Sequence, residues 1–110
     1  MPLPLPQSFI TCDWNAIEET EHPGETGTAY WRTQQHEGVR VRMVRYSAGY
    51  LADHWCERGH VLLVLSGTLV TEVEGAGTVT LEAGCSYAVA DGASSHRSRT
   101  ATGATLFIVD

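Results

Sequence analysis

A short segment of the chain places nitrogen and sulfur donors at spacings that suit a metal ion. His54 and Cys56 are two residues apart, so in an extended segment both side chains leave the same face, while Trp55 points the other way. Residues 57–59 are typical of a tight turn, and His60 then opens an apolar run. A returning strand would bring His60 back beside His54, so we expect these side chains to share one location.

His96 could reach the same point from a later part of the chain. It follows the turn at residues 91–92, and the curvature of a closed sheet would carry it inward. Imidazole and thiolate donors suit a transition metal such as Zn, Fe, Ni, Cu or Mn much better than Mg or Ca. The alternative is that the histidines bond to backbone groups and that Cys56 packs as a small apolar side chain.

Five further residues are candidates for contacts around such a site. Asp53 and Glu57 flank the donor segment, where a carboxylate could accept an imidazole N–H and fix the ring, or be solvated. Arg42 could hold a substrate carboxylate if it faces inward, and otherwise it lies on a wet sheet face. Tyr87 and Trp31 are expected on the wall of a cavity.

The other histidines and cysteines show no comparable pattern. His22 and His36 lie in polar, turn-like segments and are expected to be solvated, and Cys12 and Cys85 have no evident partner. Three cysteines are too few for a disulfide framework, and an odd number leaves one unpaired. This favours a reducing compartment, and we expect a cytoplasmic protein.

These residues must be positioned by short β-strands. In residues 39–45 apolar and charged residues mostly alternate, as in a strand with one buried face. The β-type runs, separated by glycine-containing turns, are 29–33, 39–45, 60–65, 68–73, 78–81, 86–90, 96–99 and 104–109. Many short strands without a long helix predict an all-β sandwich or a closed barrel, which also removes exposed sheet edges.

The first 28 residues differ from the rest in their content of proline and glycine. We expect residues 1–28 to form an N-terminal arm with one short helix near residues 14–19, capped by Asp13, that packs on the barrel or on a partner subunit. Residues 29–110 are then a single barrel domain. A core of this size is modest, so a homodimer is expected.

Composition excludes several classes of function. The 110 residues are 43% hydrophobic and 18% charged, which argues against disorder and against a membrane protein. A formal charge of −6 argues against a nucleic-acid partner, because phosphate binding depends on clustered basic residues. All seven basic residues are arginine, so lysine-based Schiff-base chemistry is excluded.

The donor segment resembles the first motif of the cupin superfamily. Gly49, His54, Cys56, His60 and Gly67 match its pattern, with cysteine where the second histidine is usual, histidine where the glutamate is usual, and one residue fewer after the first glycine. The stretch 52–60 is similar to the group of small cupins named for a DHCW motif.

The second cupin motif is matched more loosely. Gly84 and Gly92 keep its spacing, Ala90 replaces its proline, and His96 comes one residue later than the pattern places its histidine. Residues 99–100, Arg-Thr, stand where its asparagine is usual.

The resemblance implies a cupin-type jelly-roll barrel whose mouth binds a small molecule and one divalent transition metal, Fe, Zn, Mn or Ni. It implies that His54, His60 and His96 hold the metal, with Cys56 as a further candidate ligand. A histidine-based site favours O₂ or redox chemistry, as in a dioxygenase-like enzyme. If Cys56 also ligates, a closed four-donor site suits structural zinc in a non-catalytic binding or sensor protein. No residue is assigned as a catalytic acid or base.

Overall fold

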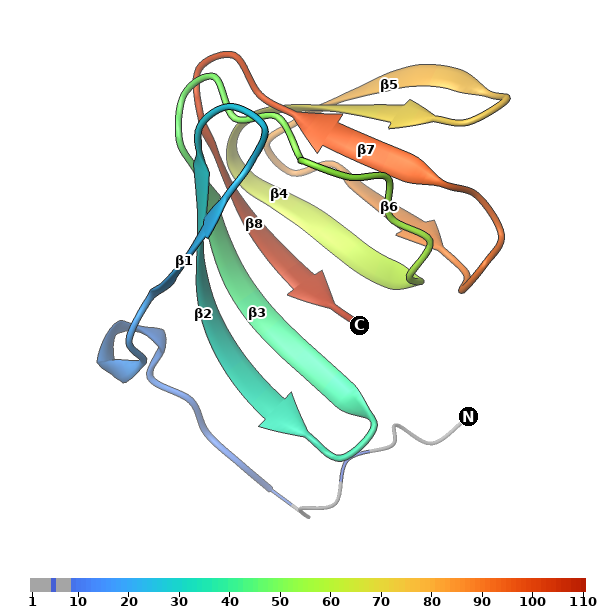
Figure 1. The fold of residues 1–110 in the computed structure, drawn as a ribbon. Coiled ribbons are helices and arrows are strands. Elements are labelled where there is room, and N and C mark those ends of the chain that lie inside the picture. Colours follow the sequence, from blue (N-terminus) through green and yellow to red (C-terminus); the bar gives the residue numbers. More distant parts are fainter. Residues whose placement is uncertain (1–4, 6–8) are drawn as a thin grey trace.

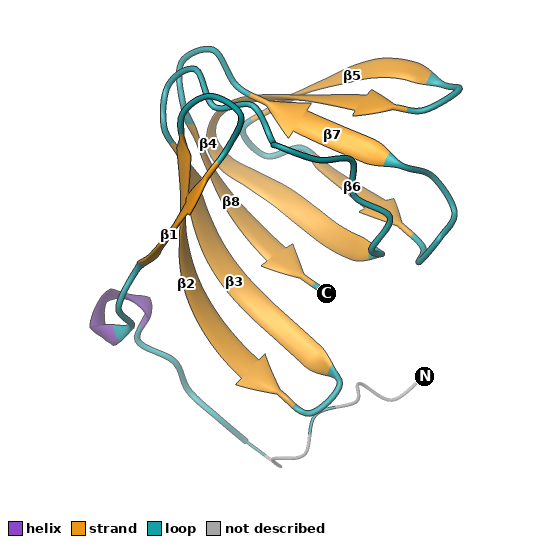
Figure 2. Ribbon diagram, in the orientation of Figure 1, coloured by secondary structure: helices purple, strands orange, loops and turns teal. Residues whose placement is uncertain are grey.

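The computed structural model describes residue 5 and residues 9–110, and its regular structure is dominated by antiparallel strands (Figures 1 and 2). The elements are η1 (Trp14–Ala16), β1 (Thr20–Pro23), β2 (Thr28–His36), β3 (Val39–Tyr46), β4 (His60–Val73), β5 (Gly77–Glu82), β6 (Ser86–Val89), β7 (His96–Arg99) and β8 (Ala104–Val109). The predicted all-β class is confirmed. Within the described part of the chain, no helix is long and apolar enough to cross a lipid bilayer.

Strand β4 joins two sheets. Its first part pairs with β8 and β6, and its second part pairs with β5 and β7. The first sheet continues from β8 through β3 and β2 to β1. The register with β8 shifts between Val64 and Ser66, next to Gly67, whose φ is +80° and where a Cβ would collide with the carbonyl oxygen of Gly103. Only glycine fits there, and β4 passes from one layer to the other at this point.

The hydrophobic core lies between the two layers of strands, whose arrangement Figure 1 shows. Leu62 and Val64 on β4, Leu106 on β8 and Val44 on β3 are at most 2% exposed, and they alternate with side chains that face outward. Leu69, after the shift in β4, is also fully buried, so one strand supplies the core from both layers. At the start of β4 this apolar layer ends, and the polar side chain of His60 lies on the same face as Leu62.

The segment before the barrel contains a 3-10 helix of three residues, Trp14–Ala16, where a helix near residues 14–19 was expected. It also contains one strand that the sequence did not reveal. Asp13 caps η1 by accepting a hydrogen bond from the Asn15 backbone N–H at 3.1 Å. Trp14 packs edge-to-face on Phe107 of β8, with ring centroids 6.1 Å apart. Thr20–Pro23 then pairs with β2 as an edge strand, a position where proline is tolerated. Trp14 and β1 of the segment expected as an arm thus pack on the first sheet, whereas Phe9 and Ile10 are 86% and 46% exposed, and residues 1–4 and 6–8 of that segment lie outside the described residues.

Candidate metal site

Three potential metal ligands converge between the two sheets. Cys56, His60 and His96 bring one donor atom each to within 4.8 Å of one another. Cys56 and His96 are locked side by side because each backbone N–H donates to the other's carbonyl oxygen, at 2.8 and 3.0 Å. His60 opens β4 with the same parity as buried Leu62, so its side chain faces inward.

His96 has a nitrogen whose hydrogen-bonding capacity is not met. The residue is only 4% exposed, and its Nδ1 lies 3.0 Å from the carbonyl oxygen of Ser94, to which it donates as an N–H. Nε2 then carries a lone pair, and it is buried with no hydrogen-bond partner among the described residues. A buried nitrogen left without a partner is costly, and a metal ion would satisfy it.

His60 is held as a neutral imidazole. Burial, and next the charge of His96, lower the pKa of His60 to about 4, so its lone pair is available at neutral pH. Its Nε2 lies 2.8 Å from the hydroxyl of Tyr87, whose own pKa burial raises to about 12. The hydroxyl therefore stays protonated near neutral pH. When it accepts from Nε2–H, Nδ1 of His60 is left for a metal.

His54 lies outside this group. Its side chain is 75% exposed, and its Nδ1 lies 2.6 Å from the Asp53 carboxylate, a contact that lowers the pKa of Asp53. The sequence expectation assumed an extended segment, but the backbone bends at residues 53–54 and forms a bridge only at Cys56. Side-chain alternation therefore does not hold. For the same reason Trp55, expected to point away from Cys56, helps to line the cavity.

The three donors lie on the wall of a cavity of about 400 Å³. Of the other sequence candidates, Trp31, Arg42, Tyr87, Glu57 and His54 also line it, whereas Asp53 does not. Glu57 accepts a hydrogen bond from the Ser95 hydroxyl at 3.2 Å rather than from an imidazole. The volume is that of a small-molecule site.

The cavity also contains a second group of charged residues, of which the sequence analysis identified only Arg42. Arg40 donates from Nε and Nη2 to both carboxylate oxygens of Asp110, at 2.9 and 2.8 Å. Arg42 Nη2 donates to the same carboxylate at 3.1 Å, and Arg58 Nε lies 3.3 Å from it. These arginines hold the pKa of the Asp110 side chain below its usual value against the opposing effect of burial, and the side chain is 1% exposed.

Arg42 is the most buried of these arginines. The residue is 6% exposed, and its guanidinium carbon lies 4.2 Å from the centre of the Trp31 ring, on which it stacks. Arg45, of opposite parity on β3, pairs on the outer surface with Glu19 at 3.2 Å. Strand parity therefore separates the two arginines, with Arg42 on the cavity side.

Two histidines that were expected to be solvated are in fact packed. His22 stacks on Trp31, with ring centroids 3.6 Å apart, and bonds with the Thr20 hydroxyl at 2.8 Å. His36 is 6% exposed, at the end of β2. Both expectations were wrong because the polar segments around them form paired strands rather than loops.

Comparison with known proteins identifies the fold. Ectoine synthase from P. lautus is 19% identical with a TM-score of 0.74, over 92% of this chain and 76% of that one. A predicted oxalate decarboxylase from Thermotoga maritima is 14% identical with a TM-score of 0.77, over 91% and 96% of the two chains. A cupin-superfamily sugar phosphate isomerase from Silicibacter pomeroyi is 19% identical with a TM-score of 0.64, over 91% and 74%. The fold is the cupin jelly roll.

The comparisons by sequence give no match. No family model matches the chain, and no curated protein matches it. At identities of 14–19%, the solved structures establish the cupin fold that the motifs of the chain imply. The chemistry must be argued from the residues of this chain.

Proposed function

We propose that this chain is a metal-dependent cupin that binds a small molecule, with Cys56, His60 and His96 as the ligands of one divalent transition metal. The observation that carries the proposal is the buried, unpartnered Nε2 of His96, which belongs to a group with two further donors. One thiolate and two imidazoles suit Zn, Fe or Ni better than the harder Mn.

The donor set favours an open site. Three protein ligands leave at least one coordination position free, whereas a fourth protein ligand would close the site. A metal bound there supplies a Lewis acid and, if it is redox-active, access to O₂ chemistry. With His54 outside the group, the arrangement supports a dioxygenase-like oxidoreductase over structural zinc.

The surrounding residues fix the donors and shape the cavity. The Ser94 carbonyl sets the tautomer and orientation of His96, and the Tyr87 hydroxyl orients His60. Leu62 and Ile108 provide apolar wall next to the donors, which limits access of water.

A non-catalytic ligand-binding cupin is the second candidate. The two carboxylates that line the cavity are already engaged, Glu57 by Ser95 and Asp110 by three arginines. Asp110 is thereby held as the counter-ion of the arginines and is not available as a general base, which favours this candidate, whereas Oε2 of Glu57 accepts no hydrogen bond among the described residues. Oxygen uptake by the metal-loaded protein with candidate substrates would favour the enzyme, and ligand binding without turnover would favour the second candidate.

Metal content of untagged protein, measured by elemental mass spectrometry after reconstitution, tests the metal site. We expect about one ion per chain in the wild type and in His54→Ala, and below about one-tenth in His96→Ala and Cys56→Ser. Circular dichroism checks that each variant is folded. A wild type that binds less than about one-tenth of an ion per chain, or a loss in His54→Ala equal to that in His96→Ala, would refute the assignment.

We also propose a place in the DHCW-motif group, a homodimer and a cytoplasmic location. The stretch Asp53–Cys56 supports the first through its residue types, although its order is Asp-His-Trp-Cys, with tryptophan and cysteine exchanged relative to the motif. Val61 and Leu65 on the outer face of β4 are 52% and 43% exposed, an apolar surface that a second copy would cover. Three free cysteines suit a reducing compartment. Sedimentation equilibrium would test the dimer.

A further inference from the structure

We infer that the cavity contains a carboxylate-binding subsite centred on Arg42, with the positive charge of Arg40 beside it, and that its ligand is a small organic carboxylate. The inference deepens the proposed function by naming the chemical class of the small molecule. The subsite itself is built from residues outside the metal group. It can therefore be tested with and without metal.

Arg42 has unused hydrogen-bonding capacity in a buried position. A guanidinium carries five N–H donors. In the described chain only Nη2 of Arg42 makes a side-chain hydrogen bond, to Asp110, and Nε is buried without a partner. Both oxygens of Asp110 are already taken by the paired hydrogen bonds of Arg40. Because Arg42 shares the Asp110 carboxylate with Arg40, the Arg42 guanidinium has N–H donors left with which to bind a second anion.

The cavity concentrates positive charge in an acidic protein. Of the seven basic residues in a chain with net charge −6, four line this cavity, against two carboxylates among the described residues that line it. The lining residues of each sign are Arg40, Arg42, Arg58 and Arg97, and Glu57 and Asp110. The difference is two positive charges before any metal is counted. A concave, positively charged surface raises the local concentration of anions.

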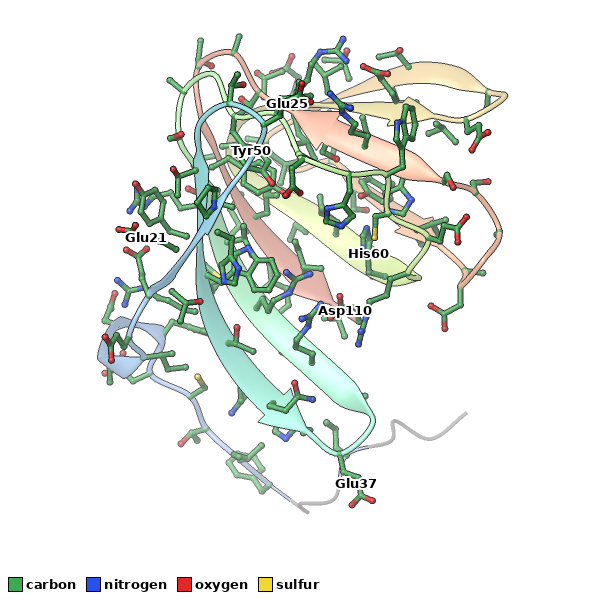
Figure 3. The ribbon with its side chains drawn as sticks, in the orientation of Figure 1. Glu21, Glu25, Glu37, Tyr50, His60 and Asp110 are labelled. Atoms are coloured by element: carbon green, nitrogen blue, oxygen red, sulfur yellow. The ribbon has the colours of Figure 1, made fainter. Side chains whose placement is uncertain are left out.

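The strand register places this subsite beside the metal group. Val61 of β4 pairs with Val109 of β8, so the next residues along the two strands, His60 and Asp110, lie opposite each other. On the other side of Asp110, its backbone exchanges hydrogen bonds with the backbone of Arg40 on β3. Figure 3 shows His60 and Asp110 near each other in the space between the sheets.

Arg42 pairs with Ile108, which pairs with Leu62, and this row of residues across the sheet is the next one on the same face as Arg40, Asp110 and His60. Arg42 is two strands from β4, or about 10 Å at the usual spacing between strands, and its long side chain reduces this separation. The charges of Arg42 and Arg40 help to lower the pKa of His60, as expected for neighbours. A ligand held by Arg42 would extend toward the metal group.

The shape of the subsite favours a carboxylate with a carbon skeleton. One face of the Arg42 guanidinium is covered by Trp31, so a ligand must bind at its edge, in the plane, as carboxylates do. The neighbouring wall at Leu62 and Ile108 is apolar and suits methylene groups. A planar, two-oxygen group on a short carbon chain meets both conditions.

Calorimetric titration with succinate, using metal-free and zinc-loaded full-length protein, tests the subsite. Succinamide, a neutral analogue of similar size, and inorganic phosphate are the comparison probes. Arg42→Gln is the test variant, and Arg45→Gln, on the other face of β3 and paired with Glu19, is its matched control. We expect succinate to bind wild type and Arg45→Gln equally, and Arg42→Gln at least about tenfold more weakly. Succinamide should not bind.

Each outcome supports or overturns the inference. No binding of succinate to the wild type, equal binding of succinamide, binding of phosphate alone, or unchanged affinity in Arg42→Gln would overturn it. If Arg42→Gln does not fold, Arg40→Gln takes its place, because the Arg40 side chain is less buried at 21% exposed. If the protein binds succinate but no metal, the carboxylate subsite is supported and the metal site is refuted. If the protein binds metal but no succinate, the metal site is supported and the carboxylate subsite is refuted.

Discussion

The two ends of the cavity differ in how their central residues, Cys56 and Arg42, are positioned. The metal end consists of Cys56, His60 and His96, and its first member comes from the irregular segment between residues 52 and 59. The arginine end consists of Arg40, Arg42, Arg58 and Asp110, of which Arg40 and Arg42 belong to β3, Asp110 directly follows β8, and Arg58 comes from the same irregular segment as Cys56. Strand parity fixes which side chains face the cavity in the regular part, whereas in the irregular part each residue is placed by its own contacts.

The largest expected effect concerns the arginine end. Asp110→Asn removes the charge that balances Arg40, Arg42 and Arg58, and it leaves the buried Arg42 guanidinium uncompensated. Loss of one partner from a buried pair costs about 3 kcal/mol, so we expect that decrease in the free energy of unfolding. Urea denaturation of the metal-free protein would measure it.

A matched variant on the outer face of β3 gives the contrast. Glu19→Gln removes the partner of Arg45 and Arg32, but these side chains are 28–52% exposed. Exposed pairs contribute little, so the expected loss is under about 1 kcal/mol. Equal effects of the two substitutions would show that the Asp110 cluster is energetically like a surface pair.

The same contrast explains what could be predicted from sequence. Alternation in residues 39–45 predicts β3 correctly, because period-two burial depends only on local pattern. The prediction of two strands at 60–65 and 68–73 was wrong, because Gly67 accompanies a register shift within the single strand β4 rather than a turn. The runs 96–99 and 104–109 coincide with β7 and β8. Thr20–Pro23 was missed because its pairing with β2 is set by tertiary contact, not by its own composition.

Residue type identified the donors of the metal end, but their grouping depends on a backbone bend that has no local pattern. The sequence paired His54 with His60, whereas the structure pairs Cys56 with His96 through backbone hydrogen bonds. The arginine end has the opposite character. The side-chain directions of Arg40 and Arg42 follow from strand parity. Asp110, however, is 70 positions from Arg40 in the sequence, and only the register between β3 and β8 shows that the two residues meet.

Thiol reactivity provides the second prediction, at the metal end. The protein has three free cysteines, and only Cys56 lies in the metal group. Zinc should slow the reaction of one thiol with a chromogenic thiol reagent by at least about tenfold, because a metal-bound thiolate is less available as a nucleophile. The protection should disappear in His96→Ala. Unchanged rates for all three thiols would argue against ligation by Cys56.

The third prediction concerns pH in the metal-free protein. The pKa of His60 is about 4 in the folded state and near 6.5 when unfolded, so between these values the unfolded chain binds a proton that the folded protein does not. Stability should therefore fall as pH decreases from 6.5 to 4. Because His60 is only partly buried, the expected loss due to this group is about 1 kcal/mol. Denaturation midpoints at pH 7 and pH 4.5 in the wild type and His60→Gln would measure it.

His22 is the control for this prediction, since its pKa is also lowered and acts in the same direction. Asp110, whose pKa is lowered from 3.8, loses most of its contribution below that pH and little of it at pH 4.5. A pH dependence that persists in His60→Gln and is lost in His22→Gln would assign the effect to the stacked histidine on Trp31 instead.

The smallest expected effect belongs to the residues that looked most like ligands in the sequence. Asp53 and His54 bond to each other on the surface, with side chains 59% and 75% exposed. Asp53→Asn should change the dissociation constant of the metal by less than about twofold, because an exposed ion pair contributes little and neither partner belongs to the group of three donors. Competition with a chromogenic chelator would measure the constant. A change near tenfold would mean that His54 swings inward when metal binds and that the bend at residues 53–54 is not fixed, and the metal end would then have a fourth, mobile ligand.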